Sequence, residues 1–103
     1  MERSPMINVA VNREQVAAFC RKYRVRRLAA FGSVLRQDFR PDSDVDVLVQ
    51  FEPEARVGFL ALARMARELS SILGRRVDLV PQEGLKPLLR DEVLAEAEVL
   101  FAG

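Results

Sequence analysis

The segment after Asn12 alternates apolar and polar residues with the period of an α-helix. Its apolar stripe recurs at intervals of three and four residues and consists of Val16, Phe19, Cys20 and Tyr23. Asn12 is a favourable N-cap residue, and Gln15 stands three positions later, as in a capping box. The pattern predicts an amphipathic helix that begins near Asn12 and packs Cys20 as a small apolar side chain.

Three shorter apolar runs have the length of β-strands. They cover residues 25–31, 44–51 and 75–80, and turn-forming residues or proline bound them. Between the first two runs, Gly32 and Ser33 predict a turn, and residues 33–36 predict a short helix. Residues 38–43, which include Pro41, predict a loop. The chain is therefore expected to contain at least three strands.

Two further stretches repeat with helical spacing. The first leads up to Gly74 as a C-cap, and its apolar residues are Leu62, Met65, Leu69, Ile72 and Leu73. The second fits one or two final helices, bent near Pro87, with apolar residues Leu85, Leu88, Leu89, Val93, Leu94 and Ala97. Both stretches alternate with the predicted strands along the chain, so helices and strands should share one core.

Length and pattern together limit the architecture. A chain of 103 residues suits one compact core. We expect residues 1–11 to form a loose lead-in and residues 12–103 to form a single domain. The order of elements predicts an α/β (α+β) fold, with a mixed sheet of three or more strands and helices packed on one face. A separate substrate-binding domain does not fit in this length, so a partner would have to complete the function.

Composition and charge exclude several classes of protein. Half of the residues are apolar and 30% are charged, which is typical of a globular domain. The net charge of +1 gives no overall basic field, so direct contact with nucleic acid is not expected. Neither an export signal nor an apolar run of roughly 18 to 20 residues is present, so no membrane contact is expected. One cysteine and no histidine leave no internal disulfide or zinc site, which favours the cytoplasm.

Carboxylates on the predicted strands carry the candidate chemistry. Asp44 and Asp46 are two positions apart, so they would lie on the same face of one strand, and Asp78 lies in the next strand. Neighbouring carboxylates repel each other unless a cation lies between them. Oxygen ligands without histidine or thiol partners favour Mg²⁺, with Mn²⁺ as a substitute. These three residues are therefore predicted to be catalytic and to bind two metal ions.

Candidate phosphate-binding residues precede these carboxylates in the chain. Gly32 lets the backbone approach an anion closely, Ser33 offers a hydroxyl and an N–H, and Arg36 can neutralise phosphate oxygens. Combined with the metal site, they indicate phosphoryl or nucleotidyl transfer from a nucleoside triphosphate. In such a reaction Asp78 would either bind the second ion or accept the proton of the attacking hydroxyl.

Each acidic residue also has a purely structural interpretation. Asp44 could be a turn former before its strand. Asp46 could form an ion pair, with Arg27 or Arg76 as its partner. Asp78 could point into water from a strand at the edge of the sheet.

The motif residues, taken together, are Gly32, Ser33, Arg36, Ser43, Asp44, Asp46 and Asp78. Their combination resembles the signature of the DNA polymerase β-like nucleotidyltransferase superfamily, in which a Gly-Ser pair, an arginine and a D-x-D motif follow one another. Length and the leucine-rich C-terminal segment are similar to the minimal nucleotidyltransferases, the MntA-type antitoxins that pair with HEPN-domain toxins. The resemblance covers about residues 28–101 and departs at Gln37, where the pattern often has glycine.

This resemblance implies a small mixed α/β fold and a site for two Mg²⁺ ions at the three aspartates. ATP would be held near Gly32, Ser33, Arg36 and Ser43. The resemblance also implies an antitoxin that transfers AMP from ATP to a tyrosine hydroxyl of its HEPN toxin. Two other functions stay open. The chain could be a non-catalytic antitoxin that neutralises its toxin by forming a complex, or a small-molecule transferase of the aminoglycoside type that acts as a dimer.

Overall fold

The computed structural model describes residues 12–32 and 44–103. In chain order the elements are α1 (Arg13–Lys22), β1 (Val25–Phe31), β2 (Val45–Phe51), α2 (Phe59–Leu73), β3 (Val77–Pro81), the short 3₁₀ helix η2 (Gln82–Gly84), α3 (Pro87–Glu96) and β4 (Glu98–Ala102). The predicted lead-in at residues 1–11, the short helix at 33–36 and the loop at 38–43 lie outside the described residues.

The four strands form one mixed sheet in the order β3-β2-β1-β4. β1 pairs antiparallel with both β2 and β4, while β2 pairs parallel with β3. The parallel connection runs through α2, because parallel neighbours need a crossover rather than a tight turn. The predicted α/β class with a mixed sheet of three or more strands is confirmed, and β3 and β4 form the edges.

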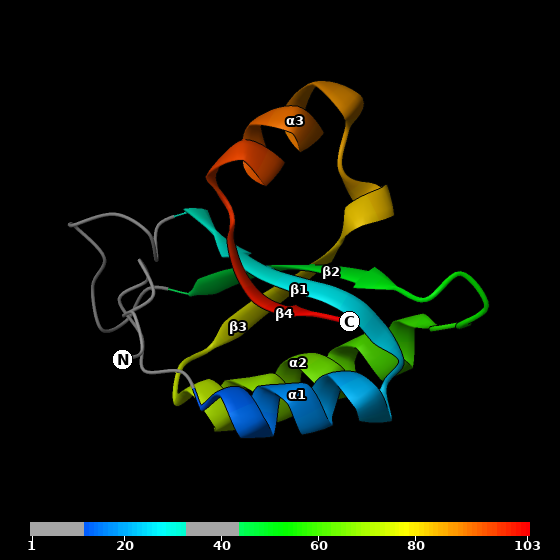
Figure 1. The fold of residues 1–103 in the computed structure, drawn as a ribbon, viewed down its shortest axis with the longest axis vertical. Helices are drawn as coiled ribbons and strands as arrows, with labels where there is room; N and C mark the ends of the chain where they lie inside the picture. The colour runs from blue at the N-terminus through cyan, green and yellow to red at the C-terminus, as the bar shows by residue number, and fades with distance from the viewer. Residues whose placement is uncertain (1–11, 33–43) are drawn as a thin grey trace.

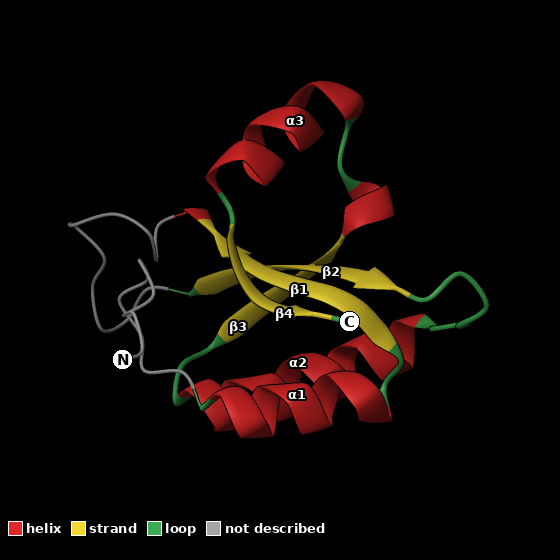
Figure 2. Ribbon diagram, in the orientation of Figure 1, coloured by secondary structure: helices red, strands yellow, loops and turns green. Residues whose placement is uncertain are grey.

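The helices lie on both sides of this sheet. α1 and α2 run beneath it in Figure 1, whereas α3 lies above it, and Figure 2 shows the same three layers. The expected packing of helices on one face holds for α1 and α2, whereas the sequence did not indicate that α3 lies over the other face. The reason is that α3 has no buried residue and exposes Leu88 and Leu89, so it lacks the apolar stripe that would bind it to the main core.

The main core lies between the sheet and the pair α1 and α2. Alternate residues of β2 point into it, and Val45, Val47 and Val49 are fully buried there. Met65 and Leu69 of α2 close the core from the other side. Across these described elements, no helix is both long and apolar enough to cross a membrane.

Both helix ends that the sequence predicted for α1 and α2 are confirmed. The side chain of Asn12 accepts a hydrogen bond of 3.1 Å from the backbone N–H of Gln15. Gly74 ends α2 in the left-handed conformation, with φ of 69°. Cys20 is buried, as predicted, and burial raises the pKa of its thiol to about 12, so this thiol is not a reactive group.

The C-terminal segment differs from the prediction. The sequence indicated one or two final helices with apolar residues through Ala97, and α3 confirms a helix there, but the strand β4 that follows at once was not predicted. Leu100 of β4 is buried in the main core, and the strand covers the free edge of β1. Helical spacing of leucines cannot reveal this, because the strand forms only where an edge with open hydrogen bonds is available.

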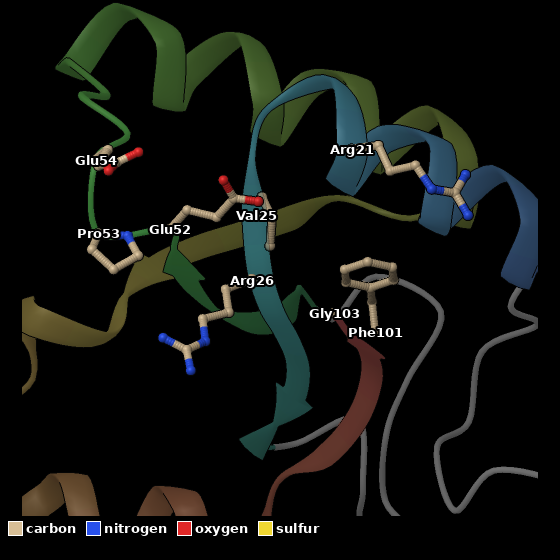
Figure 3. A pocket seen from close by; sticks show the side chains of 8 residues that line it. All are labelled: Arg21, Val25, Arg26, Glu52, Pro53, Glu54, Phe101 and Gly103. Atoms are coloured by element: carbon tan, nitrogen blue, oxygen red, sulfur yellow. The ribbon is translucent and has the colours of Figure 1, made fainter.

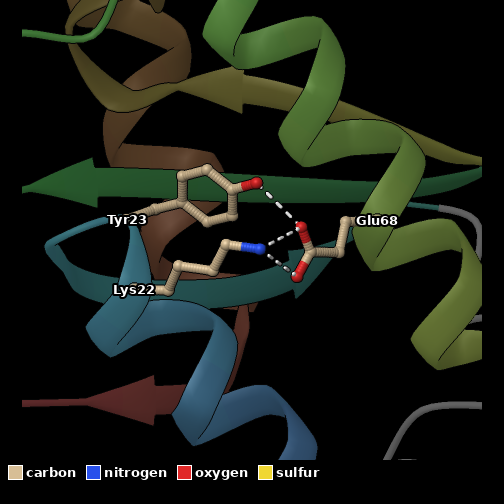
Figure 4. Close-up of polar contacts among 3 residues, drawn as sticks. All are labelled: Lys22, Tyr23 and Glu68. Atoms are coloured by element: carbon tan, nitrogen blue, oxygen red, sulfur yellow. Dashed lines mark hydrogen bonds and ion pairs between the residues drawn. The ribbon is translucent and has the colours of Figure 1, made fainter.

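A polar network joins α1 to α2 on the outer side of the helix layer (Figure 4). The carboxylate of Glu68 accepts hydrogen bonds from the Tyr23 hydroxyl at 2.7 Å and from the Lys22 ammonium at 3.1 and 3.3 Å. The Tyr23 ring also lies 5.1 Å from that of Phe19, centroid to centroid. These contacts fix the two helices against each other at a partly exposed position.

We expect the stabilisation provided by Glu68 to be lost in acid. The hydrogen bond from Tyr23, helped by Lys22, holds the pKa of Glu68 below its usual value of 4.5. A depressed folded-state pKa contributes stability above the unfolded pKa, and this contribution disappears as pH falls through the folded-state pKa. Glu68→Gln should therefore cost roughly 1 kcal/mol or less at neutral pH, because the pair is partly solvated, and nothing in acid.

Urea unfolding of the wild type and of Glu68→Gln, at pH 7 and at about pH 3, measures this difference. The two proteins should differ at the higher pH and converge at the lower one. Equal midpoints at both pH values would show that the network contributes nothing to stability.

Candidate active site

The strand ends bring four of the predicted site residues together. Gly32 follows the last residue of β1, Asp44 precedes β2, Asp46 lies in β2 and Asp78 lies in β3. The register pairs Asp46 with Asp78 across the parallel strands and with Phe31, next to Gly32, across the antiparallel strands. Residues that are distant in sequence thus meet at one end of the sheet.

Strand alternation turns these carboxylates away from the main core. Val45 and Val77 are buried in the core, so their neighbours Asp46 and Asp78 project from the opposite face. That is the face over which α3 lies (Figure 1). Asp46 is half-buried, whereas Asp44 and Asp78 are exposed. Asp78 therefore also fits the structural alternative of an exposed residue on an edge strand.

Gly32 is required by its conformation and by its closeness to Asp46. Its φ is +78°, in the region that residues with a side chain rarely adopt. A Cβ atom added to Gly32 would lie 2.6 Å from the Oδ2 atom of Asp46, closer than such contacts occur. The absence of a side chain thus lets the end of β1 lie directly against the carboxylate.

The electrostatics of the site converge on Asp46. Burial raises the pKa of Asp46 above its usual value of 3.8, and the charges of Asp78 and Asp44 raise it further. All three effects act against the ionised form, and none of them is offset by a cation beside Asp46 among the described residues. The alternative of an ion pair between Asp46 and Arg27 or Arg76 is therefore not observed there.

Arg76 instead pairs with Asp44. The Nε atom of Arg76 lies 3.4 Å from Oδ1 of Asp44, and both side chains are largely exposed. The sequence suggested Arg76 as a partner for Asp46. It could not assign the correct one, because the choice depends on the register between β2 and β3.

The chemistry of these residues fits a hard divalent cation. Carboxylate oxygens are the protein ligands that Mg²⁺ prefers, and a cation would relieve the repulsion that raises the pKa of Asp46. The side chains are not arranged around an ion, however. No group of three His, Cys, Asp or Glu residues in the described ranges 12–32 and 44–103 could hold a metal. Asp44, Asp46 and Asp78 would have to draw together to bind one.

The remaining predicted residues are not located. Ser33, Arg36 and Ser43 lie outside the described residues, as does Gln37. The grouping of Gly32 with the aspartates is therefore the part of the motif for which the structure provides geometry.

Sequence reasoning missed the acidic residues of α3 beside the site. Glu92 and Glu96, one helical turn apart, line a hollow of about 200 Å³ together with Val93, Phe31 and Gly32. The spacing of four residues was visible in the sequence as a shared helix face. The spacing could not indicate that this helix face lies next to Gly32.

A larger hollow, of about 540 Å³, lies at the other end of β1 (Figure 3). Its charged side chains, which extend in different directions in Figure 3, are Arg21, Arg26, Glu52 and Glu54. Both glutamates are within ion-pair distance of Arg24, at 3.4 and 3.7 Å. The larger hollow does not contain Gly32, which lines the smaller hollow and lies against Asp46, so we place the candidate site at the smaller hollow.

Comparison with known proteins finds relatives of this chain. Two curated archaeal relatives cover most of the chain. A Methanocaldococcus jannaschii protein assigned as a protein adenylyltransferase is 33% identical over 91 residues, which cover 88% of this chain and 96% of the relative. The protein adenylyltransferase MntA of Thermococcus cleftensis is 39% identical over 75 residues, which cover 73% and 74% of the two chains.

Solved structures share the fold. One described as a minimal nucleotidyltransferase has a TM-score of 0.69 and 45% identity, covering 82% of this chain and 85% of that one. A tri-AMPylated Shewanella oneidensis HEPN toxin in complex with an MNT antitoxin matches with a TM-score of 0.64 and 22% identity, covering 88% and 70%, a likeness of fold alone. Residues 13–100 match the family described as nucleotidyltransferase domain. The chain therefore belongs to the nucleotidyltransferase domain family, and its similarity extends to the minimal, MntA-type members.

Proposed function

We propose that this nucleotidyltransferase is the antitoxin of a HEPN toxin pair and transfers AMP from ATP to a tyrosine hydroxyl of the toxin. One observation carries the proposal. Asp46, flanked by Asp78 and Asp44, lies directly against the backbone of Gly32 at the open end of the sheet. A clustered negative charge beside a glycine backbone is what a triphosphate with divalent cations would require.

The reaction assigns a role to each described residue. The tyrosine oxygen attacks the α-phosphorus of ATP, the bond from that phosphorus to the bridging oxygen breaks, and pyrophosphate leaves. Asp44, Asp46 and Asp78 would hold two Mg²⁺ ions, which supply charge neutralisation on the phosphates. Asp78 is exposed and has two carboxylate oxygens, so one can contact an ion while the other accepts the tyrosine proton.

Phosphate binding is assigned to the first half of the motif. We propose that Gly32, Ser33, Arg36 and Ser43 contact the phosphates, since Gly32 lies against Asp46 and the other three belong to the segment that joins β1 to β2.

We also propose that residues 12–103 act as one domain in the cytoplasm. The acceptor would then come from a second protein.

Several similarities support a protein acceptor. One relative is named protein adenylyltransferase MntA, and a fold neighbour is an MNT antitoxin in complex with an AMPylated HEPN toxin. In the chain itself, α3 exposes Leu88 and Leu89 on the same side of the sheet as the candidate site. An exposed apolar pair on the side of the sheet that carries the candidate site is suited to contact with a protein substrate.

The test uses as the acceptor a HEPN-domain protein, which we expect to be encoded beside this gene. We expect incubation with Mg²⁺ and ATP to add the mass of AMP to that protein, at a tyrosine identified by tandem mass spectrometry. Removing Mg²⁺ with a chelator should abolish the addition of AMP. A stable complex that never gains AMP would replace this proposal with the non-catalytic antitoxin. AMP transfer to an aminoglycoside instead would indicate the small-molecule transferase.

A further inference from the structure

Backbone pairing holds Arg76 beside Asp44 independently of their ion pair. Arg76 precedes β3 and Asp44 precedes β2, and Val45 pairs with Val77 as the first bridge between the strands. The backbone N–H of Val45 donates a 2.8 Å hydrogen bond to the carbonyl of Arg76. The two side chains therefore start from neighbouring points on adjacent strands.

The same register places Arg76 on the face of the sheet that carries the other two carboxylates. Side chains two positions apart on a strand point to the same face, so Arg76 shares its face with Asp78. Asp44 and Asp46 share theirs by the same rule, and Asp46 is in register with Asp78. One guanidinium thus lies at the border of a group of three acidic side chains.

The contact between Arg76 and Asp44 is well suited to being exchanged. The two side chains are 79% and 47% exposed, and their separation is 3.4 Å, so the pair is solvated and weak. Water and salt can replace either partner at little cost. A guanidinium also binds phosphate oxygens through two parallel hydrogen bonds. The solvated contact of Arg76 with Asp44 is no stronger than such a pair of hydrogen bonds.

We propose that Arg76 is a positioning residue that neutralises Asp44 while no divalent cation is bound and moves to the phosphates when cations occupy the carboxylates. Arg76 therefore competes with metal for Asp44 before nucleotide arrives and adds to nucleotide binding afterwards. This inference rests on the proposed nucleotidyl transfer and assigns a role to a residue outside the motif.

The two halves of the proposal predict effects of opposite sign for Arg76→Gln. Mn²⁺ binding without nucleotide, followed by electron paramagnetic resonance, should become about two- to fivefold tighter, because the competing cation is gone. The KM for ATP in the transfer assay should rise about tenfold, with a smaller change in kcat, because a charged phosphate contact is lost. Arg76→Lys should keep Mn²⁺ binding close to that of the wild type, since it keeps the charge.

The matched control is Arg26→Gln, which removes the same charge near the start of β1, at the end remote from Gly32. Equal tightening of Mn²⁺ binding in both variants, or no tightening in Arg76→Gln, would overturn the inference and leave the proposed function standing. Tightening without a higher KM for ATP would overturn the transfer to phosphate. If the wild type binds neither Mn²⁺ nor ATP, the proposed function fails, and this inference fails with it.

Discussion

Asp46→Asn is expected to reduce AMP transfer at least about a hundredfold while the domain stays folded. Asparagine has the same shape, so Val45 and Val47 beside it keep their places in the core. The variant removes the negative charge that lies against Gly32 and between Asp44 and Asp78. A site that depends on cation binding cannot tolerate that loss.

Stability should change in the opposite direction from activity. The pKa of Asp46 is raised by burial first and by Asp78 and Asp44 next, so its ionisation works against the folded state. For a carboxylate with a raised folded-state pKa, the cost is present at neutral pH and is relieved as pH falls and the group takes up a proton. Asp46→Asn should therefore be as stable as the wild type or more so at pH 7, and the difference should shrink in acid.

The measurement pairs the transfer assay with thermal unfolding of the same preparations at pH 7 and at acidic pH. Asp91→Asn is the control, because Asp91 is an exposed acid of α3 outside the site, and it should behave as the wild type. Wild-type transfer by Asp46→Asn would remove the metal role from this residue. A large loss of stability would instead make Asp46 a structural residue.

Gly32→Ala is expected to abolish transfer and to lower stability by about 1–3 kcal/mol. Two causes add. The φ of +78° disfavours any residue with a Cβ atom, and that atom would lie 2.6 Å from the Asp46 Oδ2 atom. The carboxylate must move, or the end of β1 must move, and either shift separates the proposed phosphate-binding backbone from the proposed metal ligand.

Gly74→Ala separates these two causes. Gly74 has a similar φ of +69°, but a Cβ atom there would meet nothing within 4 Å. This control should therefore lose about 1 kcal/mol of stability from backbone strain alone and keep full transfer. Urea unfolding and the transfer assay on both variants measure the difference. If Gly32→Ala retained wild-type transfer, the close approach of Gly32 to Asp46 would have no functional meaning.

Much of the fold could be read from local patterns. The stripe in α1, the capping by Asn12 and the left-handed Gly74 depend on neighbours within one or two turns, so the sequence was sufficient for them. The same holds for β1 and β2, whose apolar runs end in turn-forming residues. Motif residues were also recognisable, because a D-x-D pair on a strand has few structural explanations.

The failures share a different cause. The strand β4 was not predicted, and the position of α3 over the other face of the sheet was not indicated by the sequence. Both errors concern segments whose own apolar pattern is weak or ambiguous, so their conformation follows from what the rest of the molecule leaves uncovered. An open edge of β1 and the buried position of Leu100 decided the strand.

The sequence by itself pointed to the family and to the residues that we propose carry the chemistry, namely Gly32 and the aspartates 44, 46 and 78. Only the tertiary structure decided how they meet. In the structure, Gly32 lies against Asp46, and Arg76 pairs with Asp44 rather than with Asp46. Two glutamates of α3 lie beside the site. The physical reason is register. Which residues face each other across strands depends on the alignment of the whole sheet, and a shift of one position would turn every one of these side chains to the other face.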